Sequence, residues 1–236
     1  MSPAPSVVVT ISDRAAELVK SGMIVGLGSG RAATAFIRSL GSKVQAGLTI
    51  LGVPTSEASA HLATQLGIPL TTLDEVDQLD LTIDGADEVD PRGNLIKGYG
   101  GALVREKIVA AASRMLVILV GDEKLVPVIG SRGKLPVEVL KFGLAATARH
   151  LELLGLSPQV RQASGAPLVT DNGNYIFHCG TGPIERPTEL EARIVAIPGV
   201  VGTGLFLGMT DMVLVQRGPQ LEIHEYRRDA VHEATR

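Results

Sequence analysis

The sequence predicts an α/β protein that has a mostly parallel sheet and a second, smaller α+β domain. Short apolar segments typical of buried strands alternate with helical segments over the first 130 residues. Hydrophobic residues make up 45% of the 236 residues and aromatic residues only 3%, which favours the aliphatic core of a parallel sheet buried on both faces. After residue 130 the pattern changes to shorter strands and turns.

The first part of the chain is expected to form strand–helix repeats. Ser12 is a suitable N-cap for a first helix, which Gly22 ends, and Ser56 is a suitable N-cap for a later one. The expected strands are 23–27, 48–53, 79–83 and 115–120. The expected later helices are about 32–40, 57–66 and 103–112. Residues 2–5 and the charged tail from Arg227 are expected to be loose.

The smaller domain is expected to span residues 131–207, while 1–130 plus 208–236 form the larger one. Its expected strands are 137–140, 168–170, 175–178 and 200–206, with a helix over 142–154. Asp171 to Asn174 is a strong hairpin signal, and Thr188 opens a capping-box pattern for a helix that Pro198 and Gly199 end. Strands at 212–216 and 221–225 are expected to rejoin the first sheet.

A glycine-rich turn between the first strand and its helix suggests an anion site. Gly28-Ser29-Gly30-Arg31-Ala32 combines backbone N–H groups, a helix N-terminus, a hydroxyl group and a cation. A plain turn between strand and helix is the alternative. The spacing is not that of a dinucleotide fingerprint or a P-loop, so a simple phosphate is favoured over NAD(P).

The stretch from 84 to 107 carries the densest set of reactive side chains. Asp84 and Asp87 follow a buried strand and are candidate acids, bases or hydroxyl acceptors. Lys97 could stabilise an oxyanion, and Glu106 lies on a predicted helix, where a general base would be held rigidly. The glycines around Lys97 allow close approach to a ligand. Lys124 follows a third strand, so the groups at 28–31, 84–87 and 121–124 are expected to meet at one sheet edge.

Composition excludes several other functions. The net charge of −3, with no long basic run, argues against nucleic acid as a partner. No apolar run reaches membrane-spanning length, no signal peptide is evident, and no histidine has metal-ligand spacing. The single cysteine, Cys179, is interpreted as a packing residue and fits a cytoplasmic location.

Two motifs make the chain resemble the ribose-5-phosphate isomerase A family. The first is Asp84-Gly85-Ala86-Asp87-Glu88. The second begins Ile96-Lys97-Gly98-Tyr99-Gly100-Gly101 and continues through Ala102, Leu103, Arg105 and Glu106 to Ile108. The resemblance extends over nearly the whole chain, including Pro136 to Val139, Thr170 to Asn174 and Ile197 to Val201. It implies a Rossmann-like domain that carries the site and a smaller ferredoxin-like α+β domain.

The resemblance also implies the reaction and the roles of the residues. It implies interconversion of ribose 5-phosphate and ribulose 5-phosphate, with no cofactor or metal, by a homodimer or possibly a tetramer. Glu106 would move the proton through a cis-enediol(ate), Lys97 would stabilise the oxygen charge, and Asp84 and Asp87 would handle sugar hydroxyls and ring opening. The implied substrate-binding residues are Ser29, Gly30, Arg31, Ala32, Gly85, Ala86, Gly98, Tyr99, Gly100 and Lys124.

Two departures from the family pattern and three alternatives remain at this point. Arg31 stands where the family commonly has a hydroxyl residue, and Tyr99 replaces a small residue. The main alternative is a sugar-phosphate-sensing domain without catalysis, which could lose the base. The presence of both Lys97 and Glu106 favours the isomerase. An amino-sugar-phosphate deaminase and a CoA transferase on the same fold are disfavoured by the same motif.

Overall fold

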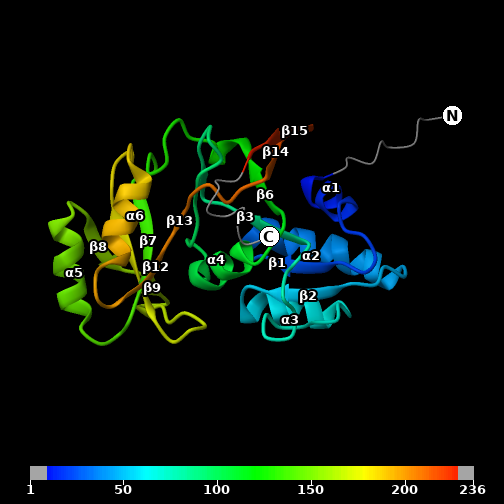
Figure 1. Ribbon diagram of the computed structural model, residues 1–236, viewed down its shortest axis with the longest axis horizontal. Helices are drawn as coiled ribbons and strands as arrows, with labels where there is room; N and C mark the ends of the chain where they lie inside the picture. Colours follow the sequence, from blue (N-terminus) through cyan, green and yellow to red (C-terminus); the bar gives the residue numbers. More distant parts are fainter. Residues whose placement is uncertain (1–9, 228–236) are drawn as a thin grey trace.

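The computed structural model describes residues 10–227, so the expectations for residues 2–5 and for the tail beyond Arg227 lie outside the described residues. The chain forms two lobes, with helix α4 (Leu103–Ala111) between them (Figure 1). Within residues 10–227, no helix combines the length and the apolar character needed to cross a membrane.

The larger lobe is built on a six-stranded sheet whose strand order is β15-β14-β6-β3-β1-β2. The strands are β1 (Ile24–Leu27), β2 (Leu51–Pro54), β3 (Leu81–Gly85), β6 (Leu116–Gly121), β14 (Met212–Arg217) and β15 (Gln220–Glu225). All neighbours are parallel except β14 and β15, which form an antiparallel hairpin. The predicted mostly parallel sheet is confirmed, and the last two strands join it as expected.

Helices cover both faces of this sheet. Alternate side chains of β6 point to opposite faces, as in any strand. Val117 and Leu119 pack in the core under α1 and α2, whereas Leu116 and Ile118 pack in the core that includes Ala110 of α4. The remaining helices of this lobe are α1 (Ile11–Glu17), α2 (Gly30–Gln45) and α3 (Glu57–Gln65). Burial on both faces explains why the strands are continuously apolar.

The chain reverses direction across the sheet at β1. From β1 it passes through α2 to β2 on one side, and then through α3 to β3 on the other side. The ends of β1 and β3 therefore lie next to each other, with Leu27 paired to Ile83. Gly28 must be glycine here, because a Cβ would lie 2.3 Å from Oδ1 of Asp84. Ligands of open α/β sheets bind at such a switch point.

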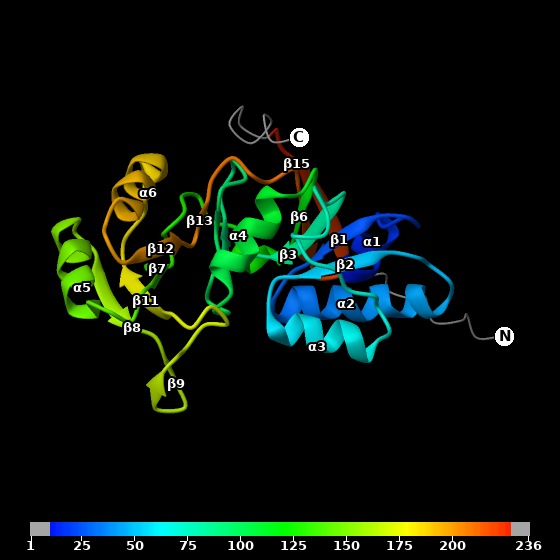
Figure 2. The ribbon, with the colours of Figure 1, turned by 60° about the horizontal axis from the view of Figure 1, so that its bottom comes forward.

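The smaller lobe has the ferredoxin-like order of elements, strand–helix–strand–strand–helix–strand. These elements are β7 (Lys134–Val139), α5 (Leu144–Leu153), β8 (Ser157–Val160), β11 (Tyr175–Gly180), α6 (Pro187–Val195) and β12 (Val200–Thr203). The sheet is antiparallel in the order β12-β7-β11-β8, and α5 and α6 pack on one face. Figure 2 shows both helices on the outer side of this sheet.

Short strands and a turn connect the two lobes. The strands β4 (Glu88–Val89), β5 (Leu95–Ile96) and β13 (Leu205–Phe206) form a small antiparallel sheet. The turn around Gly130 is held by Glu88, whose carboxylate accepts hydrogen bonds from the backbone N–H groups of Gly130 and Arg132. The domain boundaries at 130/131 and 207/208 stay predictions.

Two predicted helix caps are wrong, because the capping geometry lies elsewhere. Thr10, not Ser12, caps α1: its hydroxyl accepts from the N–H of Asp13, and the Asp13 carboxylate accepts in return. Ser12 is a buried residue inside the helix. Thr188 also lies inside a helix, since α6 begins at Pro187 with Arg186 as the N-cap. Proline is favoured at the first helical position because its missing N–H costs nothing there. The cap at Ser56 is confirmed.

Two predicted strands of the smaller lobe are also corrected. Residues 168–170 are not a strand. The chain instead forms a separate two-stranded ribbon of β9 (Gln162–Ala163) and β10 (Ala166–Pro167). The predicted strand 200–206 breaks at Gly204 into β12 and β13, which belong to different sheets. A Cβ at Gly204 would lie 2.2 Å from the carbonyl oxygen of Lys97, so this glycine lets the two lobes approach closely.

Candidate active site

A cavity of about 470 Å³ lies at the carboxyl edge of the large sheet. The three strand ends expected to meet all contribute to it, through β1 and α2, β3, and β6 with the 3₁₀ turn η1 (Asp122–Lys124). Twelve of the fourteen predicted site residues line the cavity: Ser29, Gly30, Arg31, Ala32, Gly85, Ala86, Asp87, Lys97, Gly98, Gly100, Glu106 and Lys124. The side chains of Asp84 and Tyr99 do not.

Lys97 is the buried cation at the centre of the site, with 3% of its side chain exposed. Its Nζ lies 3.0 Å from Oδ2 of Asp84 and 3.4 Å from Oε2 of Glu106, and it donates a hydrogen bond to the carbonyl oxygen of Gly85. Burial alone would lower the pKa of Lys97, but the Asp84 and Glu106 carboxylates raise it to about 12. The ammonium is therefore charged at any physiological pH.

Glu106 presents a carboxylate oxygen that has no hydrogen-bond donor. It lies in the first turn of α4 and is 4% exposed. Its Oε2 is buried and unpartnered among the described residues, apart from the ion pair with Lys97. Burial raises the pKa of Glu106 to about 8; Lys97 opposes this rise, and Asp84 and Asp87 add to it. A carboxylate with a raised pKa and a free oxygen has the properties of a general base that works near neutral pH.

Asp84 lies behind the cavity lining, although it was predicted among the catalytic residues. Its Oδ1 accepts hydrogen bonds from the backbone N–H groups of Ser29 and Gly85, and its Oδ2 pairs with Lys97. With 1% exposure, the side chain has all its contacts inside the protein. Its geometry fixes the glycine turn against the lysine, and any contact with a sugar hydroxyl stays a prediction.

Asp87 and Tyr99 meet through the backbone. Oδ2 of Asp87 accepts the N–H of Tyr99 at 2.9 Å, and Asp87 itself lines the cavity. Burial raises the pKa of Asp87, which the Tyr99 N–H and the charges of Lys97 and Lys124 oppose. The Tyr99 side chain turns into the core of the smaller lobe, where its hydroxyl donates to the carbonyl oxygen of Lys134. The structure thus gives Tyr99 only a backbone contact with the site.

The opposite end of the cavity has the features of an anion site. The N-terminus of the 16-residue helix α2 begins at Gly30, and Arg31 and Lys124 line the same space. Ser29 Oγ lies 2.8 Å from the hydroxyl of Thr55 and 2.7 Å from that of Ser56, so the turn is tied to the end of β2. Free N–H groups and two cations favour a phosphate group here.

Sequence reasoning missed part of the lining. Residues of α1, α2 and the last part of β6 that were not predicted also face the cavity: Ile11, Ser12, Ala35, Leu119 and Val120. Helix α1 precedes the sheet in sequence and is placed at its edge by packing on α2 and on the strands β6 and β14. Its amphipathic pattern predicts a helix and carries no information about which strand ends it will cover. The contribution of Ser12 therefore had no signal in the sequence.

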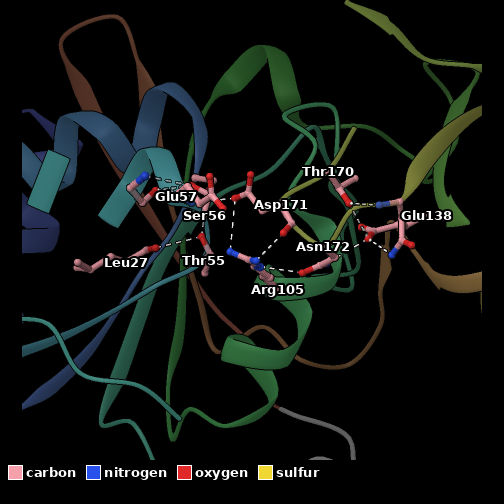
Figure 3. A network of polar contacts seen from close by, with 12 residues as sticks. Leu27, Thr55, Ser56, Glu57, Arg105, Glu138, Thr170, Asp171 and Asn172 are labelled. Carbon is pink, nitrogen blue, oxygen red and sulfur yellow. Dashed lines mark hydrogen bonds and ion pairs between the residues drawn. The ribbon is translucent and has the colours of Figure 1, made fainter. Parts of the chain in front are cut away.

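A turn of the smaller lobe ties together the helices on either side of the site (Figure 3). The Asp171 carboxylate accepts the N–H of Glu57 at the start of α3 and lies 3.6 Å from the Arg105 guanidinium. Arg105 also donates to the Asn172 side chain and to the Asp171 carbonyl group. Asn172 in turn donates to the buried Glu138 of β7. Arg105 precedes Glu106 in α4, so this turn connects the lobe interface to the helix that carries the candidate base.

We expect the variant Asp171→Ala to lower the free energy of unfolding by about 0.5–2 kcal/mol, the usual effect of removing a side-chain acceptor at a helix start. The ion pair with Arg105 is about a third exposed and adds little, at most about 1 kcal/mol. Urea denaturation measures the change. The control Asp171→Asn keeps an acceptor oxygen and should lose less. Equal stability of the alanine variant and the wild type would show that the turn does not hold α3.

Comparison with known proteins agrees with this geometry. The family model for ribose 5-phosphate isomerase A (phosphoriboisomerase A) matches residues 51–219. A ribose-5-phosphate isomerase A from Gloeobacter violaceus is 53% identical over 216 residues, which cover 91% of this chain and 94% of that protein. One from Bradyrhizobium diazoefficiens is 49% identical over 226 residues, which cover 91% of this chain and 93% of its own length.

Solved structures of similar proteins have the same fold. Ribose 5-phosphate isomerase A from Methanocaldococcus jannaschii superposes with a TM-score of 0.87 at 39% identity, covering 91% of this chain and 96% of its own. A D-ribose-5-phosphate isomerase solved in complex with phospho-erythronic acid has a TM-score of 0.87 at 35% identity. The superposition covers 91% of this chain and 95% of that chain. Both lobes are thus shared with these structures.

Proposed function

The chain belongs to the ribose-5-phosphate isomerase A family, and from this premise we propose how its residues carry out the reaction. The enzyme interconverts ribose 5-phosphate and ribulose 5-phosphate. In the proposed mechanism, the Glu106 carboxylate removes the proton from C2 of the open-chain aldose and returns it to C1. A cis-enediolate is the intermediate, and the Lys97 ammonium stabilises its negative oxygen.

One observation carries this proposal: a buried carboxylate oxygen of Glu106, which accepts no hydrogen bond from residues 10–227, lies 3.4 Å from the buried ammonium group of Lys97. Proton transfer between adjacent carbons needs a base that is not already occupied by donors. The developing enediolate needs a fixed positive charge in a low-dielectric site, where electrostatic stabilisation is strongest. The two groups face one cavity, so a single ligand can contact both.

The phosphate group of the substrate is assigned to the end of the cavity formed by α2, Arg31 and Lys124. This places the sugar toward Asp87, Lys97 and Glu106. The related isomerase in complex with phospho-erythronic acid supports a phosphorylated ligand in this fold. Asp87, which lines the cavity and keeps Oδ1 free of hydrogen bonds to described residues, is the better placed of the two aspartates to assist ring opening. Asp84 would act by holding Lys97.

Isomerisation in deuterium oxide tests the proton-transfer step. We expect deuterium from solvent at C1 of ribulose 5-phosphate, because a proton held by a carboxylate exchanges with solvent during some turnovers. Nuclear magnetic resonance of the product measures the label, with the substrate in buffer lacking enzyme as the control. Product that stays unlabelled after repeated reversible turnover would contradict the enediolate route. Binding of ribose 5-phosphate without any conversion would instead fit the sensor function.

The dependence of kcat/KM on pH follows from the state of Glu106. A base acts only when deprotonated, and burial raises the pKa of Glu106 to about 8. We therefore expect kcat/KM to increase with pH up to a plateau above this pKa, falling about tenfold per pH unit well below it. Initial rates with ribose 5-phosphate at a series of pH values measure the profile. A limb near the ordinary carboxyl pKa of about 4.3 would mean that the carboxylate is solvated in the working enzyme.

Self-association and a cytoplasmic location are proposed as the setting of this enzyme. Phe142 and Leu153 are large apolar side chains of the smaller lobe that are 92% and 79% exposed, which supports a surface covered by another copy of the chain. The single cysteine, Cys179, is buried and free, which suits a reducing compartment. A homodimer or tetramer, and the compartment itself, stay predictions.

A further inference from the structure

A second cavity, of about 540 Å³, lies in the smaller lobe and shares no lining residue with the first. It is hollowed into the end of the four-stranded sheet where β7, β8 and β11 run side by side. Gly180 pairs there with Ser157 on one side and Lys134 on the other, and its missing side chain leaves the space open. The polar side chains that line the cavity are Lys134, Ser157, Gln159, Arg161, Gln162 and His178.

The charged side chains that line this cavity are all basic. Lys134 and Arg161 are cations that can only donate hydrogen bonds, and none of the nine described lining residues is acidic. Burial, together with the charges of Lys134 and Arg161, lowers the pKa of His178 to about 4, so its ring is neutral at physiological pH. A neutral imidazole whose Nε2 carries the proton is also a donor. The cavity therefore offers donors and positive charge with no carboxylate in its described lining, while the Asp87 carboxylate of the first cavity interacts with the charge of Arg161.

Two nitrogen atoms of these side chains are buried and have no hydrogen-bond partner in the described part of the chain. Nη1 of Arg161 and Nε2 of His178 have no hydrogen-bond partner within residues 10–227. Leaving a buried polar group unpaired costs about 1–3 kcal/mol, and more when the group is charged. Native proteins seldom keep such groups together without a ligand or a functional reason. Both side chains line one cavity, and a small rotation of each side chain would bring its unpartnered nitrogen to an acceptor bound there.

The Arg161 side chain packs against the glycine loop of the active site. Its Nη1 lies against Gly101, where a Cβ would be only 3.0 Å away, so the guanidinium rests on the loop that carries Lys97 and Tyr99. The ring of His178 packs 5.9 Å from that of Tyr99, and Lys134 Nζ lies 5.0 Å from the centre of the same ring. The Tyr99 ring thus contacts His178 and Lys134, while Arg161 rests on Gly101 of the same loop. Donors that are pre-organised in this way bind a ligand at a smaller entropic cost.

We propose that this cavity is a second anion site, which binds a phosphate group through Arg161, Lys134 and His178. A guanidinium can donate two parallel hydrogen bonds to phosphate oxygens, and the lysine adds a second charge. The phosphate group can come from free inorganic phosphate or from a phosphorylated metabolite. The site is separate from the end of the first cavity assigned to the substrate phosphate, since Arg31 and Lys124 line only the first cavity.

The test needs a local signal, because inorganic phosphate will also enter the active site. The side-chain resonance of His178, assigned by its loss in His178→Gln, reports on the second cavity alone. We expect it to shift saturably when the wild-type enzyme is titrated with inorganic phosphate, and not with sodium chloride of equal ionic strength. A linear response, or an equal response to chloride, would overturn the proposal without any variant.

Matched variants separate the two cavities. Arg161→Gln should weaken the phosphate response of His178 at least tenfold, and Lys134→Gln should weaken it less. Arg193→Gln removes an exposed arginine of α6 and should change nothing. Arg31→Gln removes a cation of the first cavity and should also leave the response intact; loss of the response there would show that His178 senses phosphate bound in the active site, and would overturn the proposal. Repeating the titration with glycerol 3-phosphate distinguishes the sources, since tighter binding identifies a phosphate ester.

Discussion

Glu106→Gln should lower kcat by about 10²–10⁴-fold while ribose 5-phosphate still binds, since this is the usual effect of removing a general base. The amide has nearly the shape of the carboxylate but cannot accept the proton from C2. It also removes a negative charge beside Lys97, whose Nζ lies 3.4 Å away, so binding of an anionic substrate is not weakened by charge. Initial rates of ribulose 5-phosphate formation, together with calorimetric binding of ribose 5-phosphate, measure the two effects separately.

A matched control for this variant is Glu88→Gln. Glu88 is a fully buried glutamate only a few residues from Asp84, but its carboxylate accepts backbone N–H groups of the turn at Gly130 and does not line the cavity. We expect this change to affect stability more than kcat. If Glu106→Gln retained wild-type turnover, the base would have to be another group of the cavity, with Asp87 next by position. If both variants lost activity equally, the loss would reflect folding.

Lys97→Met is expected to lower kcat by about 10²–10³-fold, because it removes the fixed charge at which the enediolate oxygen develops. Methionine fills a similar volume without a donor. The same change leaves the buried Asp84 carboxylate without its cation, and breaking a buried pair costs about 3–5 kcal/mol of stability. It also removes the charge that opposes the raised pKa of Glu106, so the limb of the pH–rate profile should move to higher pH.

Lys107→Met serves as the control for this lysine. The Nζ atom of Lys107 lies 5.2 Å from the centre of the Phe206 ring, compared with 5.5 Å for Lys97, but Lys107 pairs with Glu191 and does not line the cavity. We expect the Lys107→Met variant to be less stable than the wild type but to have the same kcat. Rates measured below the unfolding temperature of each variant separate the two effects. A Lys97→Met enzyme that is folded and fully active would refute the electrostatic role.

The site could be predicted from sequence where the reactive residues are close together along the chain. The segment from Asp84 to Glu106 places a strand end, a glycine loop and a helix in succession, and each has a local signature. Glu106 and Lys97 were therefore found as a pair, and the structure brings their charged groups together. Residue propensity and hydrophobic periodicity were sufficient to predict these elements, because each element is short and strongly patterned.

Two of the wrong predictions have different causes. Ser12 and Thr10 are both suitable N-caps by residue type. Thr10 is the cap in the structure, and the Asp13 carboxylate accepts a hydrogen bond from its backbone N–H. The stretch 200–206 is apolar enough for one strand, but Gly204 breaks it because the backbone of Lys97 lies against that position. The cap did have a local signal, because Asp13 gives Thr10 the three-residue spacing of a capping box. The break at Gly204 had none, because the backbone that decides it belongs to a distant loop.

The amino-acid sequence was sufficient to predict the fold class, the order of most elements and the choice of Lys97 and Glu106 as candidate site residues, because these depend on periodicity and on neighbours in the chain. Anion binding by the glycine turn at residues 28–32 stays a prediction. The tertiary structure decided which strand ends are adjacent and which side chains are left without partners. It placed Asp84 behind the cavity, turned Tyr99 away from it, and brought Lys134 of β7, His178 of β11 and Arg161, which follows β8, to a second cavity. The physical reason is that burial and hydrogen-bond satisfaction depend on contacts between segments far apart in sequence, which no local pattern specifies.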